Sequence, residues 1–113
     1  MPIERAISIR QPYAELILTG RKREEYRSLS TRIRERVWIY ASARPADDPA
    51  AWRRAGQQPG DLPTAVIVGS IEIADCRKRA PGDFAYKLIG PKRLPRPKRP
   101  RNHPQPVFWR PRF

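Results

Sequence analysis

The sequence of 113 residues has one cysteine, one histidine and no apolar run of about 18 residues that could cross a membrane. The lone Cys76 excludes an intramolecular disulfide and fits the reducing cytosol, so we expect a cytoplasmic protein without a membrane partner. The lone His103 excludes a two-histidine acid–base mechanism of the ribonuclease type within one chain. No spacing of cysteines, histidines and carboxylates indicates a metal site, and we expect neither metal nor cofactor.

Acidic residues are nearly absent from the last third of the chain. Residues 77–113 contain Asp83 as their single acid and have a net charge of +11, whereas residues 1–76 have +2. Such an uneven distribution creates a strong local positive potential, which solubility alone does not require. A polyanion is therefore the expected partner, with RNA as the first candidate and DNA as the second.

Length and composition predict a single domain over residues 1–113, and the N-terminus lacks the apolar segment of a secretory signal. Alternating or continuous apolar residues predict strands at 5–10, 37–41, 64–76, 84–89 and 107–109. Gly69 interrupts the longest of these and indicates a bulge. Two short helices are predicted at 12–20 and 49–56, because each segment begins with a proline and ends with a glycine. We therefore expect an α+β fold, a small β-barrel of five or six strands with two or three short helices.

The segment 91–106, PKRLPRPKRPRNHPQP, contains six prolines and six basic residues. Closely spaced proline disfavours both helices and central strands, so this segment is predicted to be an extended or disordered basic arm. Its cations would bind phosphates without reading sequence. They are Lys92, Arg93, Arg96, Lys98, Arg99 and Arg101. Alternatively, the arm would bind a protein partner that is acidic or lined by aromatic residues.

A dense group of charged residues follows the first helix, in GRKREEYR at 20–27. If this segment turns into a strand, alternation puts Glu25 and Arg27 on one face, where Glu25 would orient Arg27 or Lys22 toward a phosphate or a base edge. Together with Arg10 these residues form the predicted ligand site, and Tyr26 is its predicted stacking platform, with Trp109 as the second aromatic candidate. One alternative is that these residues are catalytic. The other is that they form a solvated ion-pair cluster, in which each pair stabilises the fold by about 0.5 kcal/mol.

The run IRQPYAELILTGRKREEYR resembles the ASCH domain family, named for activating signal cointegrator homology, within the PUA-like group of β-barrels. The family pattern is a proline-led helix followed by Gly-x-Lys-x-x-Glu-x-Arg. The chain matches it at Gly20, Lys22, Glu25 and Arg27. Looser matches in VWIYAS, VGSIEIADC and LIGPKRLP extend the resemblance to roughly residues 5–95. The resemblance implies a barrel with a basic cleft and a function in RNA binding or coregulation.

One branch of this family removes the acetyl group from N4-acetylcytidine, and other members are reported as ribonucleases. The resemblance to that branch implies catalytic roles for Lys22 and for Glu72, which would correspond to its glutamate. Glu25 occupies the position of its threonine nucleophile. Lys22 lies near Glu24 and Glu25, and neighbouring carboxylates favour a fixed cation over a general base. In the alternative hydrolase function Glu25 would activate water and Lys22 would stabilise the oxyanion, so Lys22, Glu25 and Glu72 are its catalytic candidates.

Overall fold

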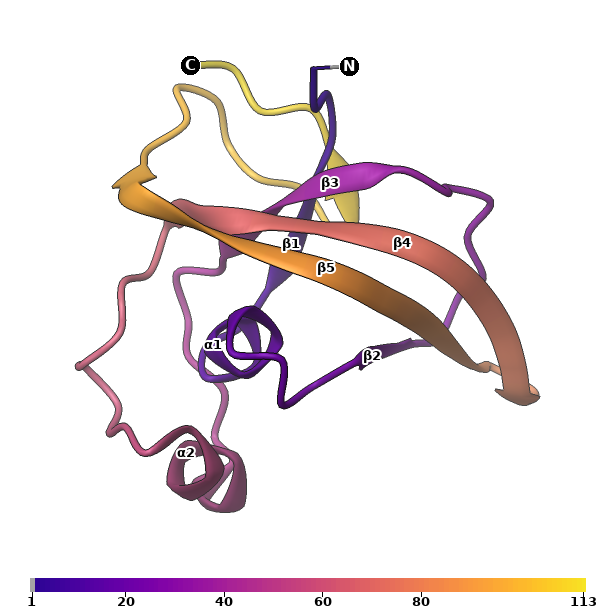
Figure 1. The fold of residues 1–113 in the computed structure, drawn as a ribbon, viewed down its shortest axis with the longest axis horizontal. Helices are drawn as coiled ribbons and strands as arrows, with labels where there is room; N and C mark the ends of the chain where they lie inside the picture. The colour runs from indigo at the N-terminus through magenta and orange to yellow at the C-terminus, as the bar shows by residue number, and fades with distance from the viewer. Residues whose placement is uncertain (1) are drawn as a thin grey trace.

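The computed structural model describes residues 2–113, which form two helices and six strands (Figure 1). Along the chain these are β1 (Ala6–Ile9), α1 (Tyr13–Leu18), β2 (Glu24–Arg27), β3 (Arg36–Ala41), α2 (Pro49–Ala55), β4 (Val66–Ala80), β5 (Asp83–Lys98) and β6 (Phe108–Trp109). The predicted segments therefore all contain an element of the predicted type. The start of α2 is fixed as the sequence indicates, because Asp48 accepts a hydrogen bond from the amide of Ala51 and Pro49 follows it.

The strands form one sheet in the order β2-β5-β4-β3-β1-β6. β1 and β3 are parallel, and every other neighbouring pair is antiparallel. The α+β class is confirmed. The predicted barrel is not confirmed, because the sheet is mixed and open, with β2 and β6 at its two ends.

The core lies between the curved sheet and α1, and both helices lie on the same side of β4 and β5 (Figure 1). Side chains from β1, β3, β4 and β5 alternate into this core, which removes their apolar surface from water. The core includes Ile7, Ile9, Ile39, Ile71, Ile73 and Tyr86, all fully buried, together with Ile17 from α1. α1 is thereby held against the sheet, and its C-terminal end fixes where the charged stretch begins.

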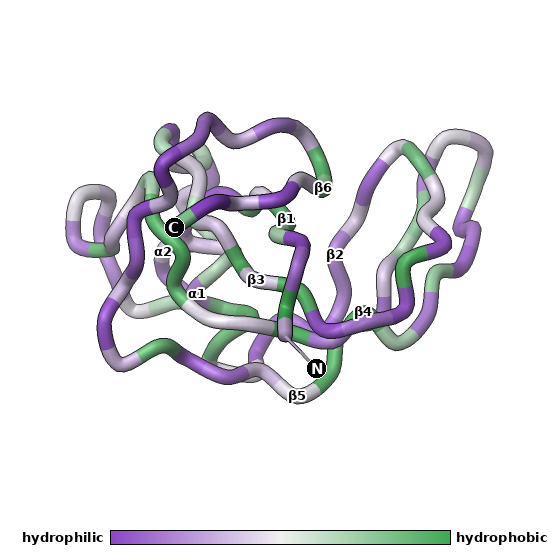
Figure 2. The backbone as a smooth tube through the Cα atoms, turned by 90° about the horizontal axis from the view of Figure 1, so that it is seen from above, coloured by the Kyte–Doolittle hydropathy of each residue, from purple (hydrophilic) through white to green (hydrophobic). Residues whose placement is uncertain are grey.

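β5 is much longer than predicted: it does not end at Ile89 but continues to Lys98, through the first half of the expected arm. The pairing with β4 explains how a strand accommodates its prolines. Pro91, Pro95 and Pro97 all fall where the register shifts, between the paired residues Ile89, Lys92, Arg93 and Lys98. At such bulges the ladder requires no amide donor. The remainder, 99–107, runs outside the sheet to β6 and is largely hydrophilic (Figure 2).

Gly69 marks the predicted irregularity. The pairing of β3 with β4 shifts between Ile39 and Tyr40, which pair with Gly69 and Ile67, so that one residue of β4 is extra. A Cβ atom at Gly69 would collide with the backbone carbonyl of Lys92 and lie 2.6 Å from Leu18 Cδ2. Glycine is therefore required here because α1 and β5 both approach the backbone of β4 closely.

Candidate functional site

The charged motif is positioned by the end of α1. Gly20 has φ of +79°, and the amides of Arg21 and Lys22 both donate to the carbonyl of Leu16, at 2.9 and 3.0 Å. This pattern ends the helix and satisfies carbonyls that would otherwise lack partners. The chain then turns into β2, where alternation puts Glu25 and Arg27 on one face as the sequence predicts, and Glu25 is only 7% exposed.

Glu25 is the centre of an ion-pair cluster with Lys22 and Arg27. Its Oε2 accepts hydrogen bonds from Arg27 Nε at 2.9 Å and lies 2.7 Å from Arg27 Nη2, while its Oε1 lies 3.6 Å from Lys22 Nζ. The side chains of Glu25, Lys22 and Arg27 are 10%, 15% and 21% exposed. Two largely buried cations share one carboxylate, so the cluster keeps a net positive charge in a poorly hydrated place, which suits an anionic ligand.

Arg27 also joins two strands that do not pair. Its Nη2 donates to the carbonyl oxygen of Ser8 in β1, at 2.7 Å. β6 pairs only with Ala6 and Ile7, so the carbonyl of Ser8 is available to Arg27. The guanidinium therefore connects β2 to β1 across the opening of the sheet. Its Nε and Nη2 groups are used in contacts within the protein.

The predicted cleft residues meet in one concave region, here called the cleft. It consists of two hollows of about 400 Å³ each, which share Tyr13, Glu25 and Tyr26. The cleft lies between β1 and β2 and includes every residue of the predicted site near the motif. Its lining is Ser8, Arg10, Tyr13, Lys22, Glu25, Tyr26, Arg27, Ser42, Asp48 and Pro106.

Tyr26 is the exposed aromatic side chain of the cleft, with 47% of its surface accessible. Two cations lie over its ring: Lys22 Nζ at 4.9 Å and Arg79 Cζ at 4.3 Å from the ring centroid. Arg79 comes from the β4–β5 hairpin and was not among the predicted site residues, since nothing in local sequence relates it to β2. Trp109, the other predicted platform, is only 6% exposed and packs edge-on against Tyr40 at 5.2 Å, so it is a core residue.

Tyr13 and Asp48 form a contact that the sequence analysis missed. The Tyr13 hydroxyl donates to Asp48 Oδ2 at 2.7 Å and thereby ties α1 to the start of α2 at the edge of the cleft. This hydrogen bond, with burial and the charge of Asp48, raises the pKa of Tyr13 to about 12. The same bond, together with the amide of Ala51, lowers the pKa of Asp48 below its usual value. Tyr13 therefore stays neutral, and Asp48 stays ionised, throughout the physiological range.

Glu72 is not part of the cleft. It lies in β4 opposite Arg36 and Ile89, between Ile71 and Ile73, whose side chains point into the core. Alternation therefore turns Glu72 toward the other face of the sheet. The three predicted catalytic residues are not brought together: Lys22 and Glu25 meet, and Glu72 lies apart from them.

The predicted phosphate-binding residues of the arm are all exposed, but they do not line the cleft. Arg93 is engaged within the protein by a two-pronged pair with Glu15, at 2.9 and 2.8 Å, which raises the pKa of Arg93 above its usual value. Lys98 lies over the ring of Phe113, 4.4 Å from its centroid. The end of the arm does reach the cleft, because Pro106 lines it and Ser8 donates to the carbonyl of Gln105 at 3.3 Å.

Residues 2–113 contain neither a metal-binding cluster nor a helix that could cross a membrane. No group of three or more histidine, cysteine, aspartate or glutamate side chains there is arranged to hold a metal ion. Neither α1 nor α2 is long and apolar enough to span a membrane.

Comparison with known proteins gives a consistent result. The sequence model of the ASCH domain matches residues 7–91, which include both the motif and the cleft strands. Activating signal cointegrator 1 of Homo sapiens is 32% identical over 80 residues, covering 62% of this chain and 14% of that protein. The Mus musculus protein of the same name matches with the same identity and coverage. The chain thus spans a small part of the length of these relatives, and the match is to a domain. This chain belongs to the ASCH domain family.

Proposed function

We propose that this ASCH domain binds RNA, with the cleft holding one nucleotide of a single strand and the exposed cations of the arm holding neighbouring phosphates. The observation that carries the proposal is the meeting of Arg10, Lys22 and Arg27 with exposed Tyr26 in one hollow region. Cations beside a stacking surface are the usual means of holding an unpaired nucleotide. Single-stranded RNA offers accessible base faces together with phosphates, whereas the bases of duplex DNA are stacked inside the helix.

The roles within the cleft follow from the contacts. Arg27 is occupied by Glu25 and Ser8, so it positions the carboxylate and spans the opening of the sheet. Arg10 is exposed and forms no ion pair within residues 2–113, which leaves its guanidinium for a phosphate. Lys22 neighbours both Glu25 and the Tyr26 ring, so it would contact the polar edge of a base stacked there.

A salt titration of single-stranded RNA binding tests the proposal. The logarithm of affinity should fall linearly with the logarithm of salt concentration, with a slope of about 0.7 for each phosphate contact. Arg10→Gln should weaken binding and reduce this slope by about 0.7, the amount expected for one phosphate contact. Arg112→Gln, which removes one exposed charge outside the cleft, is the matched control. Absence of salt dependence would contradict the electrostatic basis of binding, and preferential binding of duplex DNA would replace RNA as the partner.

The alternative hydrolase function has less support from the geometry. Lys22 forms an ion pair with Glu25 at 3.6 Å, and Glu72 lies on another face of the sheet. Incubation with N4-acetylcytidine and with labelled RNA, using wild type beside Lys22→Ala, separates binding from turnover. Turnover that depends on Lys22 would make the cleft an active site, and turnover that survives the substitution would assign it to other residues.

A further inference from the structure

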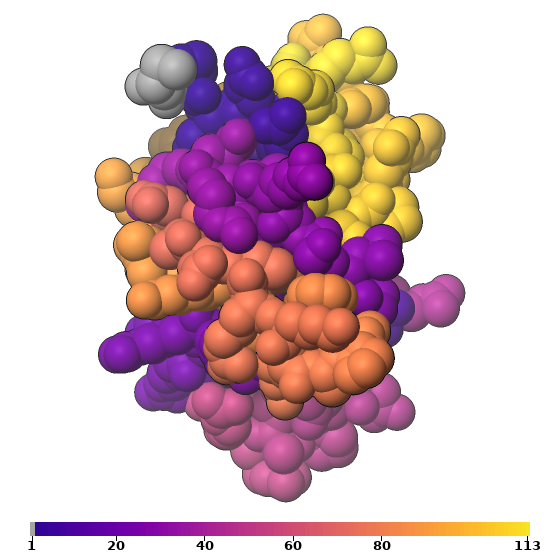
Figure 3. Space-filling model, turned by 90° about the vertical axis from the view of Figure 1, so that its right-hand side faces the viewer, coloured from indigo at the N-terminus to yellow at the C-terminus, as the bar shows by residue number. Residues whose placement is uncertain are grey.

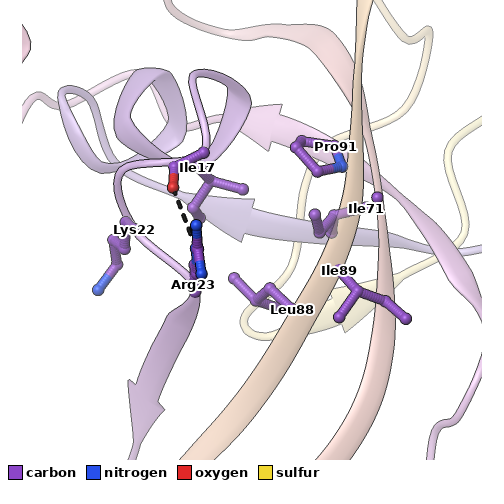
Figure 4. A pocket seen from close by; sticks show the side chains of 9 residues that line it. Ile17, Lys22, Arg23, Ile71, Leu88, Ile89 and Pro91 are labelled. Atoms are coloured by element: carbon purple, nitrogen blue, oxygen red, sulfur yellow. Dashed lines mark hydrogen bonds between the residues drawn. The ribbon is translucent and has the colours of Figure 1, made fainter.

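A smaller hollow adjoins the cleft and is here called the apolar hollow (Figure 4). Its volume is about 310 Å³. Lys22 borders both the cleft and the apolar hollow, and in Figure 4 its amino group points away from the apolar side chains. The lining of the apolar hollow is Ile17, Gly20, Lys22, Arg23, Ile71, Leu88, Ile89, Gly90 and Pro91. The two concave regions are thus neighbours separated by one lysine.

The wall of the apolar hollow offers a surface for a flat apolar group. Ile17, Ile71 and Leu88 are core residues whose outer edges reach the hollow, and Ile89 is exposed to 41%. Ile89 lies opposite Glu72 in the ladder of β4 and β5, so it borders the hollow from the face of the sheet that points away from the core (Figure 4). No acidic side chain lines this hollow. A nucleobase, apolar on its faces and polar at its edges, matches such a wall.

One arginine lines the apolar hollow, and two others, joined to each other, lie in segments next to its lining residues. Arg23 lines it, with Nε donating to the carbonyl of Gly20 at 3.5 Å (Figure 4). Beside it, Arg21 donates to the backbone carbonyl of Arg54, and Arg54 Nη2 donates to the carbonyl of Arg21 at 3.4 Å. The ends of the two helices are thereby joined, and each of the two guanidinium groups is held at the backbone of the other arginine. On the surface, the segment after α1 and the segment carrying α2 lie next to each other (Figure 3).

The hydrogen bonds to the helix ends use only part of the donor capacity of these three arginines. Each guanidinium has five N–H donors, and these contacts use one donor of each arginine. All three arginines are exposed, and none forms an ion pair within the described chain, residues 2–113. Like charges placed together repel each other unless an anion joins them, and a phosphate fits the planar fork of arginine.

We infer that the apolar hollow with Arg21, Arg23 and Arg54 is a second nucleotide subsite, which takes the nucleotide adjacent to the one in the cleft. Its base lies against the apolar wall that Ile89 borders, and its phosphate contacts the arginines. Lys22 lies between the two bases. This inference rests on the proposed RNA binding, and it adds that the domain recognises a step of two unpaired nucleotides. A basic peptide is disfavoured at this place by three uncompensated positive charges.

The test compares two double variants that remove the same charge. Arg23→Gln/Arg54→Gln removes two subsite cations, whereas Arg32→Gln/Arg34→Gln removes two exposed arginines of the loop before β3. Affinity is measured for a mononucleotide and for a single-stranded tetranucleotide over a series of salt concentrations. For the tetranucleotide, the subsite variant should lose about 0.7 of the salt slope per phosphate contact, while the control keeps the wild-type slope. Mononucleotide affinity should be unchanged in both variants.

A second measurement examines the base. A tetranucleotide with 2-aminopurine at successive positions should show two adjacent quenched positions in wild type and one in Ile89→Ser. Equal tetranucleotide binding by the subsite and control variants, or a single quenched position in wild type, would overturn the second subsite and leave the proposed function intact. Failure of wild type to bind any single strand would overturn both.

Discussion

The buried carboxylate of Glu25 provides the sharpest test of how the cleft is held together. Glu25→Ala would remove the shared partner of Lys22 and Arg27 and leave both cations in a place where water reaches them poorly. Glu25→Gln would keep the shape and one carbonyl oxygen that can accept from Arg27, but it would remove the negative charge. The two variants therefore separate the effect of charge from that of packing.

The expected magnitude follows from burial. Removing one partner of a fully buried ion pair costs about 3–5 kcal/mol, because the remaining charge is uncompensated. The cations here are 15% and 21% exposed, so partial hydration reduces the cost to about 2–3 kcal/mol for Glu25→Ala. For Glu25→Gln we expect about 1 kcal/mol, the usual contribution of one hydrogen bond. Glu35 provides a comparison, since its two carboxylate oxygens both accept from Arg5 Nη1, at 2.9 and 3.1 Å. The Arg5 and Glu35 side chains are 31% and 39% exposed, so Glu35→Ala should cost less than about 1 kcal/mol.

Urea unfolding followed by tryptophan fluorescence measures these changes. With a slope of about 2 kcal/mol per molar urea, Glu25→Ala should lower the midpoint by about 1 M or more. Glu35→Ala should lower it by less than half of that. Equal losses for Glu25→Ala and Glu35→Ala would refute the reasoning, because burial would then have no influence on the value of the pair. A changed slope would show instead that the substitution alters the compactness of one of the two states.

Two further predictions concern the surroundings of the cleft. Gly69→Ala should destabilise the domain by about 1–3 kcal/mol, since the new methyl group would collide with Leu18 of α1 and with β5. Thermal unfolding measures this loss, and an unchanged midpoint would contradict the close approach of α1 and β5 to Gly69. Tyr13→Phe should remove a pH-dependent contribution to stability. The raised pKa of Tyr13 makes this contribution complete below pH 10 and lost as pH rises through about 12, while the lowered pKa of Asp48 makes it decline as pH falls below 3.8. The difference in unfolding midpoint between wild type and Tyr13→Phe should therefore be greatest at neutral pH, and a constant difference across pH would count against the hydrogen bond.

The features that the sequence predicts correctly are those fixed by local chemistry. Gly20 ends α1, and Asp48 with the following proline starts α2, because such residues satisfy or avoid the free amides and carbonyls of helix ends. The alternation of β2 places Glu25 and Arg27 on one face, whatever the rest of the chain does. These local rules were sufficient to bring four residues of the motif into the correct arrangement.

The features that the sequence did not predict depend on partners far away along the chain. Tyr13 and Asp48 are 35 positions apart, and Arg79 is 53 positions from Tyr26, so no periodicity relates them. The extension of β5 through three prolines depends on bulges that only the pairing with β4 defines. For the same reason, deletion of 91–106 is a poor test of the arm, because it would remove half of a central hairpin strand together with the charges.

The open sheet and the candidate site have the same physical origin. Closure of a barrel would require β2 to pair with β6, or with the part of β1 that β6 leaves unpaired, and the hydrogen bonds of that ladder would occupy the space where the cleft lies. Instead, the guanidinium of Arg27 crosses from β2 to the carbonyl of Ser8, and Glu25 holds that guanidinium in place. A side chain thus replaces strand pairing at this point. The glutamate and arginine of the motif therefore keep the opening at a fixed width, which leaves Arg10, Lys22 and Tyr26 as the groups available to a ligand.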